Sequence, residues 1–401
     1  MRAFPLFCTL VAALAAPLAA QVALPGVPLP RLDRVVPPLV EPVQDLARSA
    51  TQLARERIRT LDRLVRRESA VIERDARGDP ARRGELLVMD LNAVELGLAE
   101  TAGFAVLGTE RIGELDLAVT RLRAPAGLAL AEAEALLQRT LPGAVVSADV
   151  LHFQSGTGGD GARPAPSSFS SARGTPIGVI DGAPGRAVPV AAMRGFATGA
   201  PLASNHGSAV VSLLASAGAG PIRVADVYGS DKAGGNALAI ARALGWLVGQ
   251  GSRVVTISLV GPRNPVLERA VAAARGKGVV IVAAVGNDGP AAPPAFPASY
   301  PGVLAVTAVD GQRRALIEAG RALHLDYAAP GADISGLDAK GKRIALRGTS
   351  FAAPLVAARV ARALRTANWR GTLDAEAIDL GKKGRDEVYG GGLLCARCKG
   401  R

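Results

Sequence analysis

The segment Gly348–Pro354, which reads GTSFAAP, constrains the fold of this chain most, because it places one serine just before a long apolar run. Proline is tolerated in a helix only in or beside the first turn, where the backbone N–H groups lack partners anyway. The segment therefore predicts a helix that begins within a few residues of Ser350. Free N–H groups and the positive dipole end favour negative charge there, and Gly348 leaves room for a ligand backbone. This setting fits a nucleophile that generates an oxyanion, and it also fits an ordinary Ser/Thr helix cap.

A serine hydroxyl becomes a good nucleophile when a base takes its proton, and the usual base is a histidine that a carboxylate orients. The chain has three histidines: His152, His206 and His324. Only His206 precedes small and apolar residues that predict a second buried helix, so the other two are interpreted as ordinary polar or half-buried histidines. The carboxylate candidate is Asp181, since the β-branched run Pro176–Gly182 is typical of a buried parallel strand that carries a polar group into a cleft.

Asp181, His206 and Ser350, in this order and each in its own local motif, resemble the catalytic triad of the subtilisin-like serine proteases. The order itself is a known property of that family. The resemblance spans about residues 174–394. It implies an α/β fold with a mostly parallel central sheet and helices on both faces, and a serine endopeptidase that forms an acyl-enzyme. In that mechanism His206 takes the proton of Ser350, and Asp181 orients and stabilises the imidazolium.

Further segments carry the same resemblance. Val279–Asn287 is similar to the family's strand that ends in the oxyanion-hole asparagine, which implies that the Asn287 side chain and the Ser350 N–H hold the oxyanion. Val303–Asp310 and Tyr327–Ile334 resemble the two segments that usually separate this asparagine from the serine. The resemblance also implies the substrate-binding residues Ser258, Leu259, Val260, Gly261, Gly286 and Gly348.

Two departures from the family pattern affect the site. Val260 stands where the family usually has glycine on the wall of the pocket for the residue before the scissile bond, so its branched side chain should narrow this pocket. Ser208 replaces the usual threonine, a mild change because both hydroxyls can bond a nearby backbone group. We predict no required cofactor and assign no metal ligands. Calcium stays open as an alternative, although no acid-rich loop supports a site for it. The isolated acids are interpreted as solvated or turn residues: Asp231, Asp288 and Asp333.

Composition bounds the class of protein. A chain of 401 residues with 49% hydrophobic residues can bury a sizeable core in two or three domains. Only 3% of the residues are aromatic, which leaves few stacking platforms for nucleic-acid bases. The net charge of +12 comes largely from arginine, and between Arg48 and Arg83 the arginines are interleaved with acids. This pattern predicts a solvated helix face with ion pairs, so we expect protein or peptide substrates and no nucleic-acid partner.

The N-terminus predicts export. Arg2 precedes the apolar segment Leu6–Ala16, and small residues before Gln21 offer a cleavage site for a signal peptide. No later run of about 18 apolar residues follows, so we predict a secreted or periplasmic protein without a transmembrane anchor.

Cysteine usage agrees with export. Cys8 would leave with the signal, and the two remaining cysteines are too few for a structural zinc site. We therefore predict that Cys395 and Cys398 close a small disulfide loop in an oxidising compartment.

Changes in composition divide the chain into segments. Within residues 44–78, leucine, isoleucine and valine recur at helical spacing among arginines. This pattern predicts an amphipathic helix, whose partner is unknown. The predicted division is a signal peptide at 1–20, a Pro-rich linker at 21–43, the Arg-rich helix at 44–78, a small α+β domain at 85–154, a flexible linker at 155–173, a subtilisin-like peptidase domain at 174–394 and a Cys-x-x-Cys tail at 395–401.

The segment 85–154 resembles the pro-domain that subtilisin-like proteases carry before the enzyme. We expect strands at 86–89, 115–122 and 144–150 and a helix at 128–140. In the family such a domain assists folding and then blocks the active site with its C-terminal tail. Because the closing strand runs into a polar, flexible stretch, we predict that the precursor cuts itself near Gln154, with Ser155 or Gly156 as alternative flanking residues.

Two other functions are compatible with parts of the pattern. A protein-binding relative could keep the fold without catalysis, although such a module needs no complete triad and no Asn287. A nucleotide site over Asp181–Gly185 is disfavoured because glycine follows the acid instead of forming the G-x-G-x-x-G turn. The sequence therefore predicts an exported serine endopeptidase that is made as an autoprocessed precursor.

Overall fold

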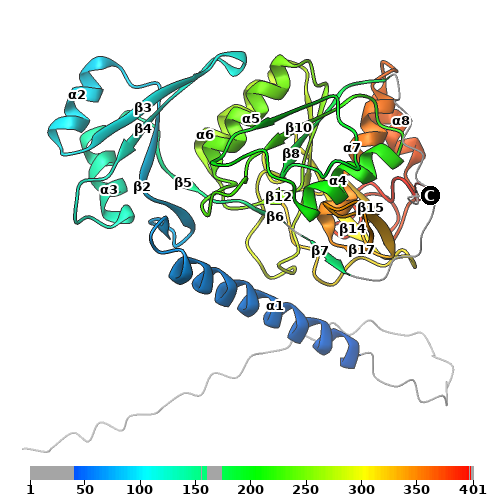
Figure 1. Ribbon diagram of the computed structural model, residues 1–401. Helices are drawn as coiled ribbons and strands as arrows, with labels where there is room; N and C mark the ends of the chain where they lie inside the picture. Colours follow the sequence, from blue (N-terminus) through cyan, green and yellow to red (C-terminus); the bar gives the residue numbers. More distant parts are fainter. Residues whose placement is uncertain (1–39, 155, 160–173, 397, 399–401) are drawn as a thin grey trace, which may run out of the picture.

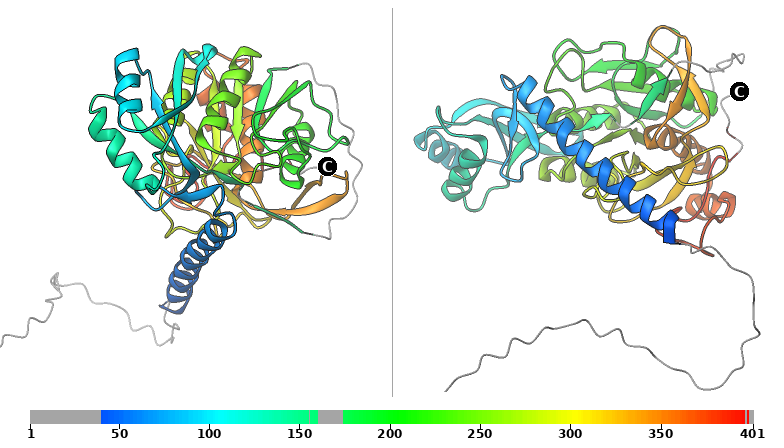
Figure 2. Two further views of the ribbon diagram at one scale, coloured as in Figure 1. Left: turned by 60° about the vertical axis from the view of Figure 1, so that its left-hand side comes forward. Right: turned by 90° about the horizontal axis from the view of Figure 1, so that it is seen from below.

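The structure is a computed structural model that describes residues 40–154, 156–159, 174–396 and 398. A small N-terminal domain lies beside a larger α/β domain, and the long helix α1 (Val40–Arg67) runs beneath both (Figures 1 and 2). The predicted signal peptide and most of the Pro-rich linker lie outside the described residues. Among the described residues, none of the helices combines the length and the hydropathy that a membrane span requires.

The N-terminal domain is an antiparallel sheet with two helices on its outer face (Figure 1). The strands run in the order β1-β2-β4-β3, and β5 pairs with β2. Asn92 begins α2 with a capping box, in which its side chain accepts from Glu95 N and Glu95 bonds back to Asn92 N. The elements are β1 Ile72–Arg74, β2 Pro80–Met89, α2 Ala93–Thr101, β3 Ala105–Ile112, a 3₁₀ turn η1 Gly113–Leu115, β4 Leu117–Arg123, α3 Leu130–Thr140 and β5 Val146–Val150.

Several predicted boundaries in this region were wrong. The amphipathic helix begins at Val40 and ends at Arg67 instead of spanning 44–78. The chain leaves the helix because Ile72 is fully buried beside Leu151, which draws it into the sheet as β1. The domain therefore begins at Ile72 rather than at 85, and it contains α2 and β3, which the sequence analysis did not identify.

The larger domain is built on a sheet of seven strands, all parallel, in the order β15-β14-β13-β11-β8-β10-β9. Helices α4 and α7 pack on one face of it, and α5 and α6 pack on the other. The predicted α/β fold with a mostly parallel sheet is thus confirmed. The sheet strands are β8 Ile177–Asp181, β9 Ala192–Gly195, β10 Ile222–Asp226, β11 Val254–Ile257, β13 Val280–Ala284, β14 Leu304–Val309 and β15 Tyr327–Pro330.

The remaining elements of this domain are helices and short edge strands. They are α4 Asn205–Ser216, α5 Ala237–Gly249, β12 Leu259–Val260, α6 Pro265–Gly276, β16 Ile334–Leu337, β17 Arg343–Arg347, α7 Thr349–Ala363 and α8 Trp369–Glu376. The chain enters the sheet at β8, adds β9 and β10 on one side, and returns to add β11 and its successors on the other. Such a reversal opens a crevice at the carboxyl ends of the strands, here between β8 and β11.

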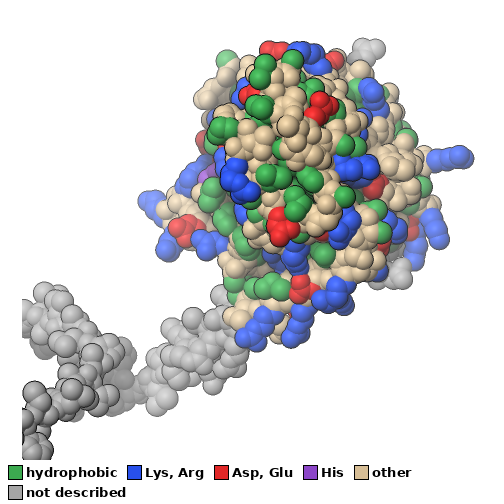
Figure 3. All heavy atoms as spheres, turned by 90° about the vertical axis from the view of Figure 1, so that its left-hand side faces the viewer, with side chains coloured by type: hydrophobic (Ala, Val, Ile, Leu, Met, Phe, Trp, Pro, Cys, Tyr) green, Lys and Arg blue, Asp and Glu red, His purple; other side chains and the backbone are tan. Residues whose placement is uncertain are grey.

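The two domains share one hydrophobic core. The sheet of the N-terminal domain packs on α5 and α6, and buried residues of both domains form a single cluster. Asp149 is fully buried at this interface, where it bonds Leu238 N and the Asn236 side chain. On the opposite face of the small domain, hydrophobic side chains lie among Lys and Arg side chains in contact with solvent (Figure 3).

The chain that leaves the small domain crosses the crevice as two short strands. Strand β6 (Phe153–Gln154) pairs antiparallel with β12, and β7 (Thr157–Gly159) pairs antiparallel with β17. Residues 157–159 were predicted to belong to a flexible linker. They instead form a strand, because the edge of β17 offers unpaired backbone groups that small residues can approach closely.

A pH dependence follows from His152, which is fully buried just before β6. Burial lowers its pKa from 6.5 to about 4, although the nearby carbonyls of Val150 and Gly235 favour the proton. The unfolded chain then binds more protons than the folded chain between these values, so His152 costs stability as the pH falls from 6.5 to about 4. Asp149 changes the stability with pH in the opposite direction, because burial raises its pKa to about 6.

We expect the substitution His152→Leu to remove the His152 contribution alone. Between pH 7 and pH 4, the free energy of unfolding of the parent protein should fall relative to that of the variant by roughly 2–3 kcal/mol. Urea unfolding of both proteins, made inactive by Ser350→Ala to keep the chain intact, measures this difference. A difference that does not change with pH would show that His152 titrates normally.

Candidate active site

Asp181 and His206 are brought together where the end of a strand lies against the start of a helix. Asp181 ends the central strand β8, and His206 is the second residue of α4. The helix begins at the N-cap Ser204, whose side chain accepts from Gly207 N at 2.9 Å. A side chain on Gly207 would collide with the carbonyl oxygen of Gly182, so glycine lets the helix start lie against the strand end.

The two side chains are in close contact and are shielded from solvent. His206 Nδ1 lies 2.9 and 3.0 Å from the two carboxylate oxygens of Asp181. Asp181 is fully buried and His206 is 9% exposed. Gly182 N also donates to Asp181 Oδ1 at 2.7 Å, which fixes the carboxylate. The carboxylate can therefore hold the imidazole in one tautomer with the proton on Nδ1.

Ser350 is the second residue of α7 and is fully buried. Pro354 lies four residues later and has no N–H, so the Ser350 carbonyl lacks its usual helical partner. Ser258 Oγ donates to this carbonyl at 2.9 Å instead. In turn, Ser350 Oγ donates to the Ser258 carbonyl at 3.0 Å. The start of α7 is thus tied to the segment that follows β11.

Two buried polar atoms in this site have no hydrogen-bond partner among the described residues: His206 Nε2 and Asn287 Nδ2. Asn287 is oriented by its oxygen, which accepts from Thr349 N at 3.0 Å. Thr349 Oγ1 in turn accepts from Gly286 N at 3.1 Å. A buried polar group is costly to leave unpaired, and such groups in native sites are often reserved for a ligand or a reaction. One atom here can accept a proton and the other can donate to an oxyanion.

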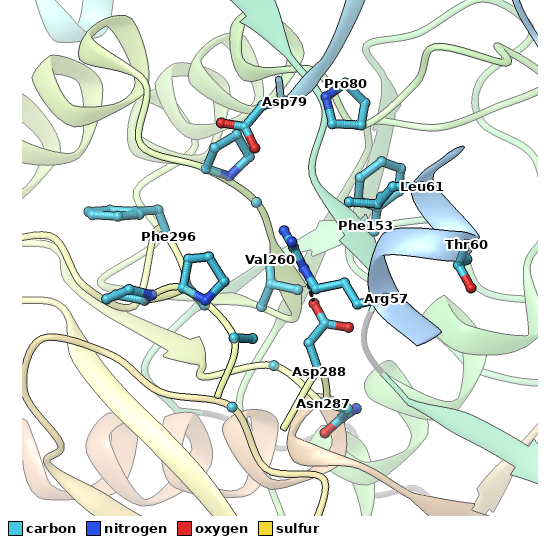
Figure 4. A pocket seen from close by; sticks show the side chains of 18 of the residues that line it. Arg57, Thr60, Leu61, Asp79, Pro80, Phe153, Val260, Asn287, Asp288 and Phe296 are labelled. Atoms are coloured by element: carbon cyan, nitrogen blue, oxygen red, sulfur yellow. Dashed lines mark hydrogen bonds and ion pairs between the residues drawn. The ribbon is translucent and has the colours of Figure 1, made fainter. Parts of the chain in front are cut away.

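A cavity of about 700 Å³ adjoins these residues. Val260 and Asn287 line one side of it, and residues of α1 line another (Figure 4). Gly261 and Gly286 also line the cavity. Two other predicted substrate-binding residues lie nearby. Leu259 of β12 pairs with Gln154 of β6. Gly348 is the N-cap of α7 and has a φ of 141°.

The crevice is occupied by the chain itself, through residues on both sides of position 155. Gln154 Nε2 donates to Asp181 Oδ1 at 2.8 Å, while its backbone lies opposite Leu259. On the other side of position 155, a Cβ built on Gly156 would lie 2.8 Å from the Phe351 ring. The described residues that flank position 155 therefore contact the neighbours of Ser258 and Ser350.

The remaining residues that the sequence analysis singled out make bonds to other protein groups. Cys395 and Cys398 are joined by a disulfide. His324 Nε2 lies 2.8 Å from the Val303 carbonyl. No group of three or more His, Cys, Asp or Glu side chains in the described residues could hold a metal ion. The isolated acids bond other groups, namely Arg82 for Asp231, Arg57 for Asp288 and Gly311 N for Asp333.

The chain matches the model of the subtilase family over residues 197–381. It is 32% identical over 206 residues to Subtilisin Savinase of Lederbergia lenta, a match that covers 50% of this chain and 74% of that protein. It is also 32% identical over 206 residues to an alkaline protease of Shouchella clausii, covering 50% of this chain and 52% of the relative. For the latter, the match spans about half of the relative's length.

One solved structure is similar to 79% of this chain. The crystal structure of fervidolysin from Fervidobacterium pennivorans, a keratinolytic enzyme related to subtilisin, matches with a TM-score of 0.64 at 18% sequence identity. The match covers 79% of this chain and 61% of that chain. At this identity the likeness concerns the fold alone.

Proposed function

Since the chain belongs to the subtilase family of serine endopeptidases, we propose that it hydrolyses peptide bonds through Asp181, His206 and Ser350, with Asn287 in the oxyanion hole. We further propose that it is exported and made as a precursor that cuts itself. The observation that carries the proposal is a pair of buried atoms in the site that contains Ser350, His206 Nε2 and Asn287 Nδ2, for which the described residues provide no hydrogen-bond partner. A protein that only binds a partner needs neither atom.

The chemistry follows from the roles of these groups. The Ser350 hydroxyl turns from the Ser258 carbonyl toward His206 Nε2, which takes its proton as Oγ attacks a peptide carbonyl. Asp181 stabilises the imidazolium that forms, because its buried carboxylate already contacts Nδ1. Asn287 Nδ2 donates to the oxyanion, and His206 then passes its proton to the leaving amine. Water hydrolyses the acyl-enzyme by the reverse path.

The N-terminal part fits the role of a covering pro-segment. Strand β6 adds to the edge of β12, as a substrate strand would, so it excludes other peptides from the crevice. Gln154 lies opposite Leu259, the residue after Ser258, and Gly156 lies against Phe351, the residue after Ser350. The bond that is cut should therefore be one of the two that join Gln154 to Gly156.

We expect the purified full-length protein to divide at this point without an added protease. N-terminal sequencing of the larger product should begin at Ser155 or Gly156, whereas the Ser350→Ala protein should stay intact. Ser252→Ala is a matched control, because Ser252 is also buried and lies outside the crevice. This control should be processed like the parent protein.

Two outcomes would contradict self-cleavage. If the parent protein and the Ser350→Ala protein migrate as the same full-length species, the small domain is a permanent part of the enzyme. If purified Ser350→Ala protein is cut as fast as the parent protein, the cleavage comes from a contaminating protease.

Export is supported by the signal-like residues 1–20 and by the disulfide between Cys395 and Cys398, since such bonds persist in oxidising compartments. Mass spectrometry of the released N-terminal fragment from the secreted or periplasmic fraction tests it. The fragment should begin at Gln21. A fragment that retains Met1 would argue against removal of a signal peptide.

A further inference from the structure

Helix α1 covers the cavity beside the candidate active site with one of its faces. The side chains that line the cavity recur at helical spacing: Leu53, Glu56, Arg57, Thr60, Leu61 and Leu64. Near the middle of the helix, a Cβ built on Gly289 would lie 3.1 Å from Leu53. At its C-terminal end, Leu64 and Val65 pack against the buried cluster of Ile72 and Leu151. The helix is therefore held over the cavity at both positions.

Arg57 differs from the other arginines of this helix in where its guanidinium lies. Its Nε bonds Asp288 Oδ2 at 2.9 Å, and its side chain is only 25% exposed. Figure 4 shows it extending from α1 into the cavity beside Val260, with Phe296 on the far wall. By contrast, the bonds that Arg63 makes to described residues are to Arg59 O and Thr60 Oγ1 of its own helix, and Arg67 is 72% exposed.

The charges that the peptidase domain contributes to this cavity favour a cation. The charged residues of the peptidase domain that line the cavity are Asp288 and Arg263. Arg263 is already paired with Glu268 at 2.6 Å. Asp288 forms its one ion pair within the described residues with Arg57. The other charged lining groups, Glu56, Arg77 and Asp79, belong to the N-terminal part and would leave with it. Separation of that part would leave Asp288 without a cation.

The position of Asp288 relates this charge to one substrate residue. Asp288 directly follows Asn287, whose side chain is placed to hold the scissile carbonyl. A residue whose carbonyl reaches Asn287 can direct its own side chain into the cavity that the same segment lines. The walls at Val260 and Phe296 are apolar, and they suit the unbranched methylene stem of a lysine or arginine.

We propose that Asp288 selects substrates with a basic side chain at the residue before the scissile bond, and that Arg57 of α1 fills this position in the precursor as an internal mimic. The precursor's own candidates for that residue, Gln154 and Ser155, are both uncharged. The charge that the pocket recognises is thus supplied by the helix and not by the covering strand. The proposal rests on the peptidase function proposed above.

The test compares two peptide substrates that differ only at the residue before the scissile bond, arginine in one and leucine in the other. The processed enzyme, obtained from the full chain, should give a higher kcat/KM for the arginine peptide. Asp288→Asn keeps the shape of the side chain and removes its charge. It should lower the ratio of the two kcat/KM values about three- to fivefold, as expected for a partly exposed ion pair. Glu387→Gln, an exposed carboxylate outside the cavity, should leave the ratio unchanged.

A second arm tests the helix. Full-length Arg57→Gln should become active after a shorter lag than the parent protein, by about two- to fivefold, because its N-terminal part is held less tightly. Arg63→Gln is the matched control and should keep the parent lag.

The outcomes separate this proposal from the proposed function. If both peptides are cut at equal rates and Asp288→Asn leaves their ratio unchanged, selection by Asp288 is overturned while the peptidase assignment stands. An Arg57→Gln lag equal to that of the parent protein would overturn the mimicry by α1. If no peptide is cut by protein whose N-terminal part has been removed, the peptidase function itself fails.

Discussion

Replacement of Ser350 by alanine is expected to lower kcat for peptide hydrolysis by about 10⁶, the size of effect known for the triad of subtilisin. Ser350 and His206 act as a unit, so His206→Ala should cost about as much, and the double substitution should cost little more. The fold should persist, because the hydrogen bond from Ser350 Oγ to the Ser258 carbonyl, which Ser350→Ala removes, is worth about 1 kcal/mol.

The assay must separate lost chemistry from a crevice that stays covered. Inactive variants would keep their N-terminal part, so a trace of affinity-tagged wild-type enzyme should first cut them and then be removed. Circular dichroism and the urea midpoint report on the fold. If the cleared Ser350→Ala protein keeps activity within tenfold of the wild-type enzyme, Ser350 is not the nucleophile.

Asn287→Ala is expected to lower kcat by about 10²–10³ with little change in KM, the magnitude known for the corresponding donor in subtilisin. The physical reason is that Asn287 Nδ2 is buried without a described partner, so it is available where charge develops in the transition state. Asn287→Asp is a useful companion. It keeps the oxygen that accepts from Thr349 N, but it replaces the donor with a charge that repels the oxyanion.

Steady-state kinetics of the processed variants measures this effect. Asn287→Asp should lose at least as much turnover as Asn287→Ala. A rise in KM at unchanged kcat in the alanine variant would mean that Asn287 positions the substrate and does not stabilise the transition state.

The candidate catalytic residues could be predicted from the sequence because each one lies where a local signal changes. Asp181 ends a β-branched strand, and His206 and Ser350 begin small-residue helices. The parallel sheet follows from the same alternation of buried strands and helices. Such signals are local, so a single sequence preserves them.

The parts that could not be predicted depend on contacts between distant segments. Ile72 continues a helical pattern in the sequence, yet its burial beside Leu151 makes it a strand residue. Thr157–Gly159 has the composition of a linker and becomes a strand only because β17 offers an edge. Arg57 and Asp288 are 231 residues apart, and an isolated aspartate before glycine gives no sign of its partner.

The reaction of the processed protein with a fluorophosphonate, followed by mass spectrometry of its peptides, tests the central claim most directly, because an activated serine reacts and an ordinary one does not. We predict a single adduct, on Ser350, that forms only after the N-terminal part has been removed. Full-length precursor should remain unlabelled, since Ser350 is fully buried in it, and unfolded protein should also remain unlabelled. An adduct on another serine, or labelling that survives unfolding, would contradict the assignment.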